Sequence, residues 1–424
     1  MTRFYIRRSF RKVRQTKHGG LLLIRQKLSQ YTPLGYLTRE CGQKLFGISI
    51  VAVLFAMVAR SLLGGGSLRD FEEKWNKDPV KGVIAGYRKK LTHRLLGRNL
   101  LRFNPQVTRK VVIGTVKTLF ERRRITISRV AIDSTKILVK GTKYPKKGTV
   151  KIKSKYYTGY KLSIVFDVVA KIPVAYILTS LNVHDSQLLI PLVKMVQSEF
   201  NNCMREVVID RAYYGAGFFN FLDQQGIRWT IPAKRYKALK EAIIKARYGD
   251  FIKIGKGNVR YHETTLELTG YGTVRCLLIA FKKFEDWMPE EEKSAAIWAL
   301  ITSHPKRSPK KIIQGYKERW QIEIFFRACK SNLGLNDLSG HDYRQINAHV
   351  GMVLLAYLAL TITVIDETET TGNFPIAIQE WLHEFIYVVV TCRLRFDWVE
   401  LSFLESSTVY WCFQNAYPGG KVKM

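Results

Sequence analysis

The stretch from Ser308 to Leu333 most constrains the fold of this chain, because it has the marks of one long amphipathic helix. Ser308 is a favourable cap residue, Pro309 suits the first helical position, and no proline or glycine interrupts the run from Tyr316 to Leu333. At about 100° per residue, one face collects an aromatic ring and three cations around a single carboxylate: Tyr316, Arg319, Glu323, Arg327 and Lys330. The opposite face is apolar and predicts packing on a core: Ile322, Phe325, Ala328 and Leu333.

A charged helix face is usually a solvated face with ion pairs, and this would be the simplest interpretation if the helix stood alone. The spacing Tyr316-x2-Arg319-x3-Glu323-x6-Lys330, however, resembles the Tyr-Arg-Glu-Lys signature of a large group of bacterial and archaeal insertion-sequence transposases. In that family the glutamate is the third member of an Asp-Asp-Glu catalytic set. The resemblance therefore implies two aspartates upstream, each at the end of a strand.

The chain supplies a candidate for each aspartate. Asp133 lies near the end of the strand-like segment 127–137, ISRVAIDSTKI, and Asp210 ends the short apolar run in REVVIDRAYYG. The second segment is similar to the family's second motif, in which an arginine, a small residue and an aromatic follow the aspartate. Taken alone, each aspartate is more simply a turn residue at the end of a strand.

The order of elements supports an α/β fold with a ribonuclease H-like core. From residue 127 the patterns predict three strands, a helix, a strand, a helix and a strand. A ribonuclease H-like core has this order and places the ends of its first and fourth strands side by side, so Asp133 and Asp210 would be neighbours. Sites in α/β sheets form where adjacent strands end.

We expect five parts along the chain. The resemblance covers about 127–345, and the family commonly carries a β insertion between the last core strand and the glutamate helix. The expected parts are a basic, mainly helical DNA-binding region (1–125), a first core part (126–235), an all-β insertion (236–293), a second core part with the glutamate helix (294–365) and a C-terminal helical region (366–424). The apolar run 46–59, which Arg60 ends, falls short of the ~20 residues that cross a bilayer and predicts a buried helix.

The formal net charge of +35 favours a polyanionic partner, most simply nucleic acid, with a membrane surface or ribosome as the competing interpretation. Residues 7–14, RRSFRKVR, suit a flexible arm on phosphates or a solubilising tail. Seven lysines lie between 140 and 155, and we expect this segment to be a DNA-gripping loop with four contacts: Lys140, Lys143, Lys146 and Lys147. The resemblance implies that Arg319 and Lys330 contact phosphates and that Tyr316 positions the strand end. Arg327, on the same face, is an equally good phosphate contact.

Two further features leave alternatives open. His184 and Asp185, in NVHDS, are similar to a motif near the site of related transposases, but a helix-capping aspartate and a surface histidine explain them equally well. The six cysteines are scattered without a C-x-x-C pair, which argues against a zinc site and a disulfide framework and favours a reducing compartment. We expect a prokaryotic cytoplasmic, nucleoid-associated protein without a membrane partner.

Three carboxylates at strand ends and on a helix suit two-metal phosphoryl transfer with two Mg²⁺ or Mn²⁺ ions. The predicted catalytic and metal-binding residues are Asp133, Asp210 and Glu323. As the resemblance implies, such a protein is a DDE-class DNA transposase that cuts double-stranded DNA at element ends and joins the 3′ hydroxyl to target DNA, as a homodimer on paired ends. The alternatives are a ribonuclease H-like nuclease without strand transfer and a non-catalytic DNA-binding descendant of a transposase.

Overall fold

The computed structural model describes residues 14–16, 18–42, 47–87, 89–255, 258–367 and 394–396. Residues 7–13 of the expected arm lie outside this range. So does the expected C-terminal helical region (366–424), apart from Asp366 and Glu367 at the end of a helix and one short strand. The chain divides into two compact units. The helical unit comprises Met1–Arg124, Val139–Lys146 and Ile324–Met424, and the sheet unit comprises Ile125–Leu138 and Lys147–Glu323.

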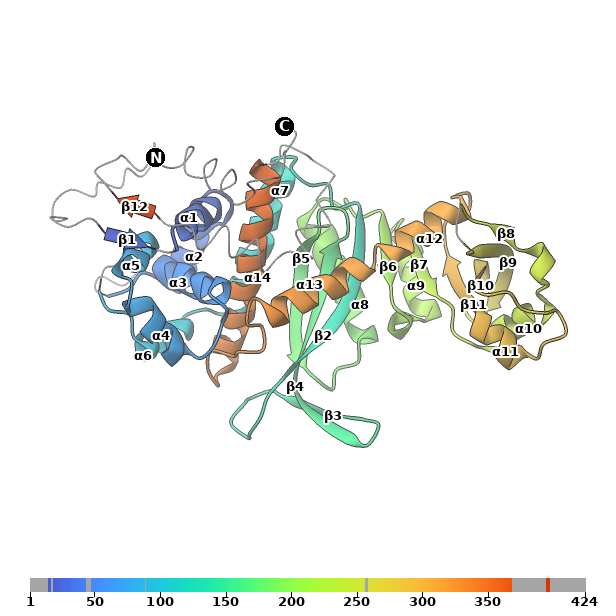
Figure 1. The fold of residues 1–424 in the computed structure, drawn as a ribbon, viewed down its shortest axis with the longest axis horizontal. Coiled ribbons are helices and arrows are strands. Elements are labelled where there is room, and N and C mark those ends of the chain that lie inside the picture. The colour runs from blue at the N-terminus through green and yellow to red at the C-terminus, as the bar shows by residue number, and fades with distance from the viewer. Residues whose placement is uncertain are drawn as a thin grey trace. The chain divides into compact units, whose positions relative to one another are not determined.

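The helical unit is built around α14 (Tyr343–Glu367), against which α1, α3, α6 and α7 pack (Figure 1). The other helices described in its N-terminal part are α1 (Gly20–Tyr31), α2 (Leu34–Cys41), α3 (Ile50–Leu62), α4 (Leu68–Asn76), α5 (Pro79–Ala85), α6 (His93–Leu100) and α7 (Pro105–Glu121). Two short strands, β1 (Arg14–Thr16) and β12 (Leu394–Phe396), pair antiparallel. The mainly helical character expected for 1–125 agrees with these elements.

The apolar run expected as a buried helix forms α3, whose side chains are almost all buried. Arg60 does not end this run at the surface, because it lies inside α3 and is itself completely buried. In the described part of the chain, one segment, Tyr343–Thr363 of α14, is apolar and long enough to cross a membrane by composition. All of that segment is buried inside the structure, as a core helix is.

The sheet unit contains one ten-stranded mixed sheet. The order along it is β3-β4-β2-β6-β7-β11-β10-β9-β8, with β5 also pairing β4. The strands are β2 (Arg129–Leu138), β3 (Gly148–Ile152), β4 (Lys155–Asp167), β5 (Ile172–Ser180), β6 (Glu206–Ile209), β7 (Arg228–Pro232), β8 (Ile252–Lys253), β9 (Arg260–Leu268), β10 (Gly272–Ala280) and β11 (Ile297–Thr302). Helix α8 (Ser186–Glu199) packs on β4 and β5, and α9 (Ala216–Gln224) packs on β7.

The predicted order of three strands, helix, strand, helix and strand is confirmed by β2, β4, β5, α8, β6, α9 and β7. Strands β2 and β6 are parallel neighbours, paired from Arg129 with Glu206 to Ile132 with Ile209. Asp133 and Asp210 follow directly beyond the last of these pairs. The expectation that these two aspartates are neighbours is therefore correct. The expectation that Asp133 lies near the end of its strand is wrong, because β2 continues to Leu138 through its pairing with β4.

Two expectations about the strands need correction. The lysine-rich segment is a loop only as far as residue 147, because β3 and the start of β4 form a hairpin between Gly148 and Gly159. Alternation of side chains in GTVKI, the sequence of β3, is the signal that was overlooked. The insertion at 236–293 is not all-β, since it contains α10 (Lys237–Lys245) and α11 (Glu290–Ala296) beside the antiparallel strands β8, β9 and β10.

Asp167, at the end of β4, gives a prediction about pH and stability. Its carboxylate is fully buried, accepts hydrogen bonds from the amides of Val169 and Ala170 at 2.8 and 2.9 Å, and has a pKa that burial raises to about 6. The folded state binds the Asp167 proton more tightly than the unfolded chain does. The contribution of Asp167 to the unfolding free energy is therefore fully present below about pH 4 and is lost as the pH rises through about 6.

We expect Asp167→Asn, whose amide oxygen keeps both hydrogen bonds, to raise the unfolding free energy by about 1–3 kcal/mol at about pH 8 and to leave it nearly unchanged at about pH 4. Thermal unfolding at the two pH values measures this difference. Asp250→Asn, at an exposed carboxylate of the same unit, is the control and should change stability by less than about 0.5 kcal/mol. A variant that is no more stable than the wild type at the higher pH would contradict the account.

Candidate active site

Asp133 and Asp210 hold their carboxylates in the same way. The Oδ1 atom of Asp133 accepts a hydrogen bond from the Ser134 amide at 2.7 Å, and that of Asp210 accepts one from the Arg211 amide at 2.6 Å. Asp210 thereby caps the short 3-10 turn Arg211–Tyr213 that follows β6. Each aspartate is thus oriented by the backbone immediately after it, at adjacent positions on parallel strands.

Glu323 reaches the same place through Arg319. The Arg319 guanidinium lies 3.4 Å from Asp133 Oδ2 and 2.6 Å from Glu323 Oε1, and all three side chains are largely screened from solvent. One cation therefore holds together two carboxylates that are 190 residues apart in the sequence, and Asp210 follows β6, the strand beside β2.

The predicted long helix is wrong in one respect, because a turn at Glu318 and Arg319 divides it. Helix α12 (Pro309–Lys317) ends there and α13 (Trp320–Ser331) begins, while the amides of Arg319 and Ile322 bond three residues back, to Tyr316 and Arg319. Glu318 and Arg319 both bind residues of β2, at Arg129 and Asp133. Consecutive side chains in such a turn point about 100–120° apart, and Glu318 and Arg319 accordingly bind two different positions of β2.

The electrostatics show that the three carboxylates affect one another. Burial raises the pKa of Asp133 to about 6, with smaller upward contributions from the negative charges of Asp210 and Glu323. The Ser134 amide and the Arg319 guanidinium act in the opposite direction. Without a cation, burial and mutual repulsion make full ionisation of this group unfavourable.

The predicted apolar face of the helix is confirmed, since Ile322, Phe325, Ala328 and Leu333 are buried. Tyr316 is also buried, and its ring contacts Trp298 at 5.2 Å and lies 5.7 Å from the Arg319 guanidinium carbon. Its immediate role is therefore to support Arg319. The contact of Tyr316 with a DNA strand end stays a prediction, as does the contact of Arg319 with a phosphate.

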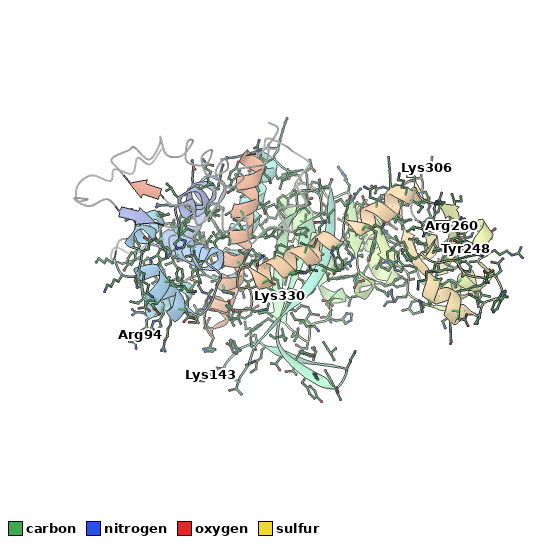
Figure 2. All side chains as sticks on the ribbon, viewed as in Figure 1. Arg94, Lys143, Tyr248, Arg260, Lys306 and Lys330 are labelled. Carbon is green, nitrogen blue, oxygen red and sulfur yellow. The ribbon has the colours of Figure 1, made fainter. Side chains whose placement is uncertain are left out.

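The other predicted DNA contacts are distributed over both units. Lys140, Lys143 and Lys146 are exposed on the loop after β2, and Figure 2 shows Lys143 extending away from the ribbon. Within the helical unit, Lys146 lies over the Tyr343 ring at 4.8 Å, and Tyr144 of this loop contacts His341 at 4.7 Å. Lys147 begins the following segment of the sheet unit and is half-buried. Arg327 is exposed on α13, and Lys330 is half-buried on the same helix.

His184 and Asp185 lie between β5 and α8. Asp185 is not a side-chain cap of α8; its carboxylate pairs with Lys161 at 3.0 Å. Its charge acts on buried Tyr213, whose hydroxyl lies 3.3 Å from Ser134 Oγ. His184 is exposed, and its Nδ1 contacts Ser186 Oγ at 2.7 Å. Asp185 is thus near the aspartates, whereas His184 makes a local turn contact.

Several residues beside the site were overlooked in the sequence. Ser134 follows Asp133 and contacts both Ser163 and Tyr213, which connects β2, β4 and the turn after β6. Arg129 binds Glu206 and Glu318. The sequence signal for Arg129 was its position four residues before Asp133, because positions i and i+4 of a strand share a face.

The carboxylates suit divalent cations by donor type, since Mg²⁺ and Mn²⁺ prefer oxygen ligands and are often held by few carboxylates. Within the described ranges, however, no three His, Cys, Asp or Glu side chains lie close enough together to hold a metal ion as they stand. The Arg319 guanidinium lies between Asp133 and Glu323 instead. The donor set fits such ions, and binding would require Arg319 to give up at least part of this pairing.

Residues 125–359 match the family model described as Transposase DDE domain. The match covers more than half of the chain and includes all three carboxylates, so the chain belongs to the transposase DDE domain family. Members of this family are enzymes of the polynucleotidyl-transferase type that bind DNA and generally use divalent metal ions.

Individual relatives are distant. The chain is 23% identical over 206 residues to a Sinorhizobium fredii protein named "Putative transposase y4zB", an alignment that covers 48% of this chain and 53% of that protein. The chain thus spans about half the length of this relative. A solved structure, the piggyBac transposase synaptic complex with hairpin DNA, shares 10% identity at a TM-score of 0.45, over 97% of this chain and 89% of that one. A likeness at that level does not establish a common fold.

Proposed function

We propose that this protein is a DNA transposase of an insertion sequence, with Asp133, Asp210 and Glu323 as its catalytic carboxylates. The observation that carries the proposal is their convergence. Asp133 lies within β2, where its pairing with β6 stops, Asp210 directly follows β6, and the glutamate binds the same arginine as Asp133. In a protein that gained nothing from these charges, bringing three half-buried carboxylates together would be costly.

The sheet supports a ribonuclease H-like core. Its central part has the order β5-β4-β2-β6-β7, in which the first strand of the core lies between the second and the fourth. Strands β2, β6 and β7 are parallel, while β4 is antiparallel to β2 and β5. The Tyr-Arg-Glu-Lys spacing further favours the insertion-sequence group that carries that signature.

Two Mg²⁺ or Mn²⁺ ions at these carboxylates would supply activation of the attacking oxygen and stabilisation of the leaving 3′ oxygen. The protein's own residues prepare the site. The Ser134 and Arg211 amides orient the two aspartates, and Arg319 neutralises Asp133 and Glu323 so that the like charges can stay close. The Arg319 guanidinium lies over the Tyr316 ring, which in turn contacts Trp298.

The reaction is tested with purified full-length protein, a labelled duplex carrying the element's own end, a target duplex and Mg²⁺. A transposase cuts at the element end and then joins the 3′ end to the target, so joined products are expected on a denaturing gel. Cutting without joining would support a ribonuclease H-like nuclease. Binding without cutting would support a non-catalytic DNA-binding protein and would overturn the proposal.

We further propose that the protein acts as a homodimer on paired element ends, in the prokaryotic cytoplasm, with the exposed loop after β2 on DNA phosphates. Replacing Lys140, Lys143 and Lys146 by glutamine is expected to weaken DNA binding about equally for all sequences. Each phosphate contact contributes about 0.9 to the slope of log K against log salt, so the slope should fall by about 2–3. Gel-shift titrations at several salt concentrations measure the slope.

The matched control removes three other exposed lysines, each already paired with a glutamate in the chain: Lys77, Lys237 and Lys283. This control loses the same net charge and should leave the slope nearly unchanged. Equal slopes for the two triple variants would show that the loop makes no particular contact with DNA.

A further inference from the structure

A second charged pair lies on the same two strands as the aspartates. Arg129 pairs with Glu206 across β2 and β6 at 2.7 Å, four positions before Asp133 and Asp210. Side chains four positions apart on a strand share a face, and here they are roughly 13 Å apart along β2. Strand β2 therefore presents a cation and an anion on one face, one at each end of its pairing with β6.

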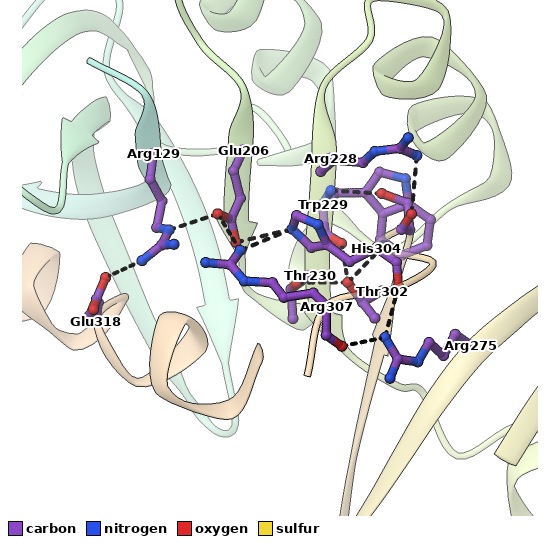
Figure 3. Close-up of polar contacts among 11 residues, drawn as sticks. Arg129, Glu206, Arg228, Trp229, Thr230, Arg275, Thr302, His304, Arg307 and Glu318 are labelled. Carbon is purple, nitrogen blue, oxygen red and sulfur yellow. Dashed lines mark hydrogen bonds and ion pairs between the residues drawn. The ribbon is translucent and has the colours of Figure 1, made fainter. Parts of the chain in front are cut away.

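The turn between α12 and α13 binds both of these charges. Arg129 Nη1 donates to Glu318 at 2.6 Å, while Asp133 pairs with Arg319 at 3.4 Å. Glu318 and Arg319 are consecutive, so the turn is attached to β2 by two ion pairs of opposite polarity. In Figure 3, Arg129 reaches from its strand toward Glu318 on one side and Glu206 on the other.

Glu206 is a firm anchor for Arg129. It is 7% exposed, receives a hydrogen bond from Arg307 at 2.6 Å and lies 3.3 Å from His304 Nε2 (Figure 3). Burial alone would raise the pKa of Glu206, but the hydrogen bonds from His304, Arg307 and Arg129 lower it to about 2. The carboxylate therefore stays charged, and the segment after β11 joins the same network.

The two ion pairs of the turn, Arg319 with Asp133 and Arg129 with Glu318, differ in whether they involve a proposed catalytic residue. Arg319 binds the carboxylates that act in the proposed function, so its pairing competes with their use. Arg129 and Glu318 bind no such group, and their attachment can persist throughout. We propose that Arg129, anchored by Glu206, positions the turn between α12 and α13 through Glu318 and thereby fixes Glu323 relative to Asp133. This role rests on the proposed function, and Arg129, Glu206 and Glu318 are positioning residues in it.

The test replaces Glu318 by glutamine in the full-length protein. Hydrogen–deuterium exchange of the metal-free protein should become about fivefold faster in a peptide covering 316–324 and stay unchanged elsewhere in the sheet unit. Single-turnover cleavage at saturating DNA in Mg²⁺ should slow by about 10–100-fold, which is typical when the support of a functional side chain is lost. The DNA dissociation constant, measured in EDTA, should stay within about twofold because no DNA contact is removed.

Glu285→Gln is the control, because this loop carboxylate in the same unit also pairs with a cation, Lys283, at 3.3 Å. It should change neither exchange at 316–324 nor cleavage. The double variant of Arg129→Gln with Glu318→Gln should cleave no more slowly than Arg129→Gln alone. Both substitutions remove the same interaction, the Arg129–Glu318 ion pair, so the second has nothing further to break. If Glu318→Gln does not fold, Arg129→Lys takes its place, because lysine keeps the charge and loses the fork of two bonds.

Wild-type exchange and cleavage in Glu318→Gln would overturn the positioning role while leaving the proposed function intact. A loss of cleavage with faster exchange throughout the sheet unit would also overturn it, because that pattern marks ordinary destabilisation. If the wild type itself does not cut DNA, the proposed function fails. The exchange measurement then still decides whether Arg129 and Glu318 hold the turn.

Discussion

Glu323→Gln is expected to lower the rate of DNA strand cleavage by at least about 1,000-fold, because the amide keeps the shape of the side chain but loses the negative charge. Asp133→Asn and Asp210→Asn should have effects of similar size. The three residues act as one unit, so combining two substitutions should add little to the loss caused by one. DNA binding should persist in each variant, since the neutral side chains remove repulsion from phosphates and no cation is lost.

Single-turnover cleavage of a labelled element-end duplex and gel-shift titration of the same duplex measure the two quantities separately. Glu285→Gln, at a carboxylate away from this site, should cut at the wild-type rate. A single variant of Asp133, Asp210 or Glu323 that kept more than about a tenth of the wild-type rate would remove that residue from the catalytic set.

Arg60→Met is expected to be the most destabilising single change in the helical unit. The buried guanidinium bonds to the carbonyl oxygens of Gly66 and Asp337, to Ser339 Oγ at 3.0 Å and to His349 Nδ1 at 3.1 Å. Burial lowers the pKa of Arg60 to about 10, so it stays protonated at neutral pH. Methionine would fill similar space and remove the donor that the carbonyl oxygens of Gly66 and Asp337 bind, at a cost of about 3–5 kcal/mol.

A loss of about 3 kcal/mol, the lower end of this range, should lower the Tm by about 6–12 °C in a unit of about 150–250 residues. Arg94→Met, at an exposed arginine of α6 in the same unit, is the control and should cost less than about 0.5 kcal/mol. Differential scanning calorimetry of the full-length proteins measures both. Equal Tm values for the two variants would show that the Arg60 network does not hold the helices α3 and α14 together.

The central strands and both aspartates could be predicted from the sequence because their signals are local. Period-2 patterns and short apolar runs define β2, β4, β5, β6 and β7. Asp210 stands directly after the apolar run of β6, and Asp133 follows the buried residues Val130–Ile132 inside β2. The neighbour relationship of β2 and β6 then follows from the order of the elements, which only a few sheet topologies accommodate.

The remaining features depend on contacts between distant residues, which single-sequence patterns do not show. No glycine or proline marks the turn at Glu318 and Arg319, and the residues that bind it, Arg129 and Asp133, are about 190 positions away in the sequence. The expected second core part, 294–365, is divided after Glu323, since the following residues group with the N-terminal helices. Arg60 suggested the end of an apolar run, yet its acceptors lie mostly some 280 positions away.

The account's central claim is that three carboxylates of one sheet unit bind the divalent ions of a DNA-cutting site. The most direct measurement is anomalous scattering from crystals of the full-length protein with element-end DNA and Mn²⁺. The account predicts two manganese peaks about 3.5–4 Å apart, ligated by Asp133, Asp210 and Glu323, with the Arg319 guanidinium moved off the carboxylates. No manganese at these side chains, with Arg319 still bridging Asp133 and Glu323, would contradict it.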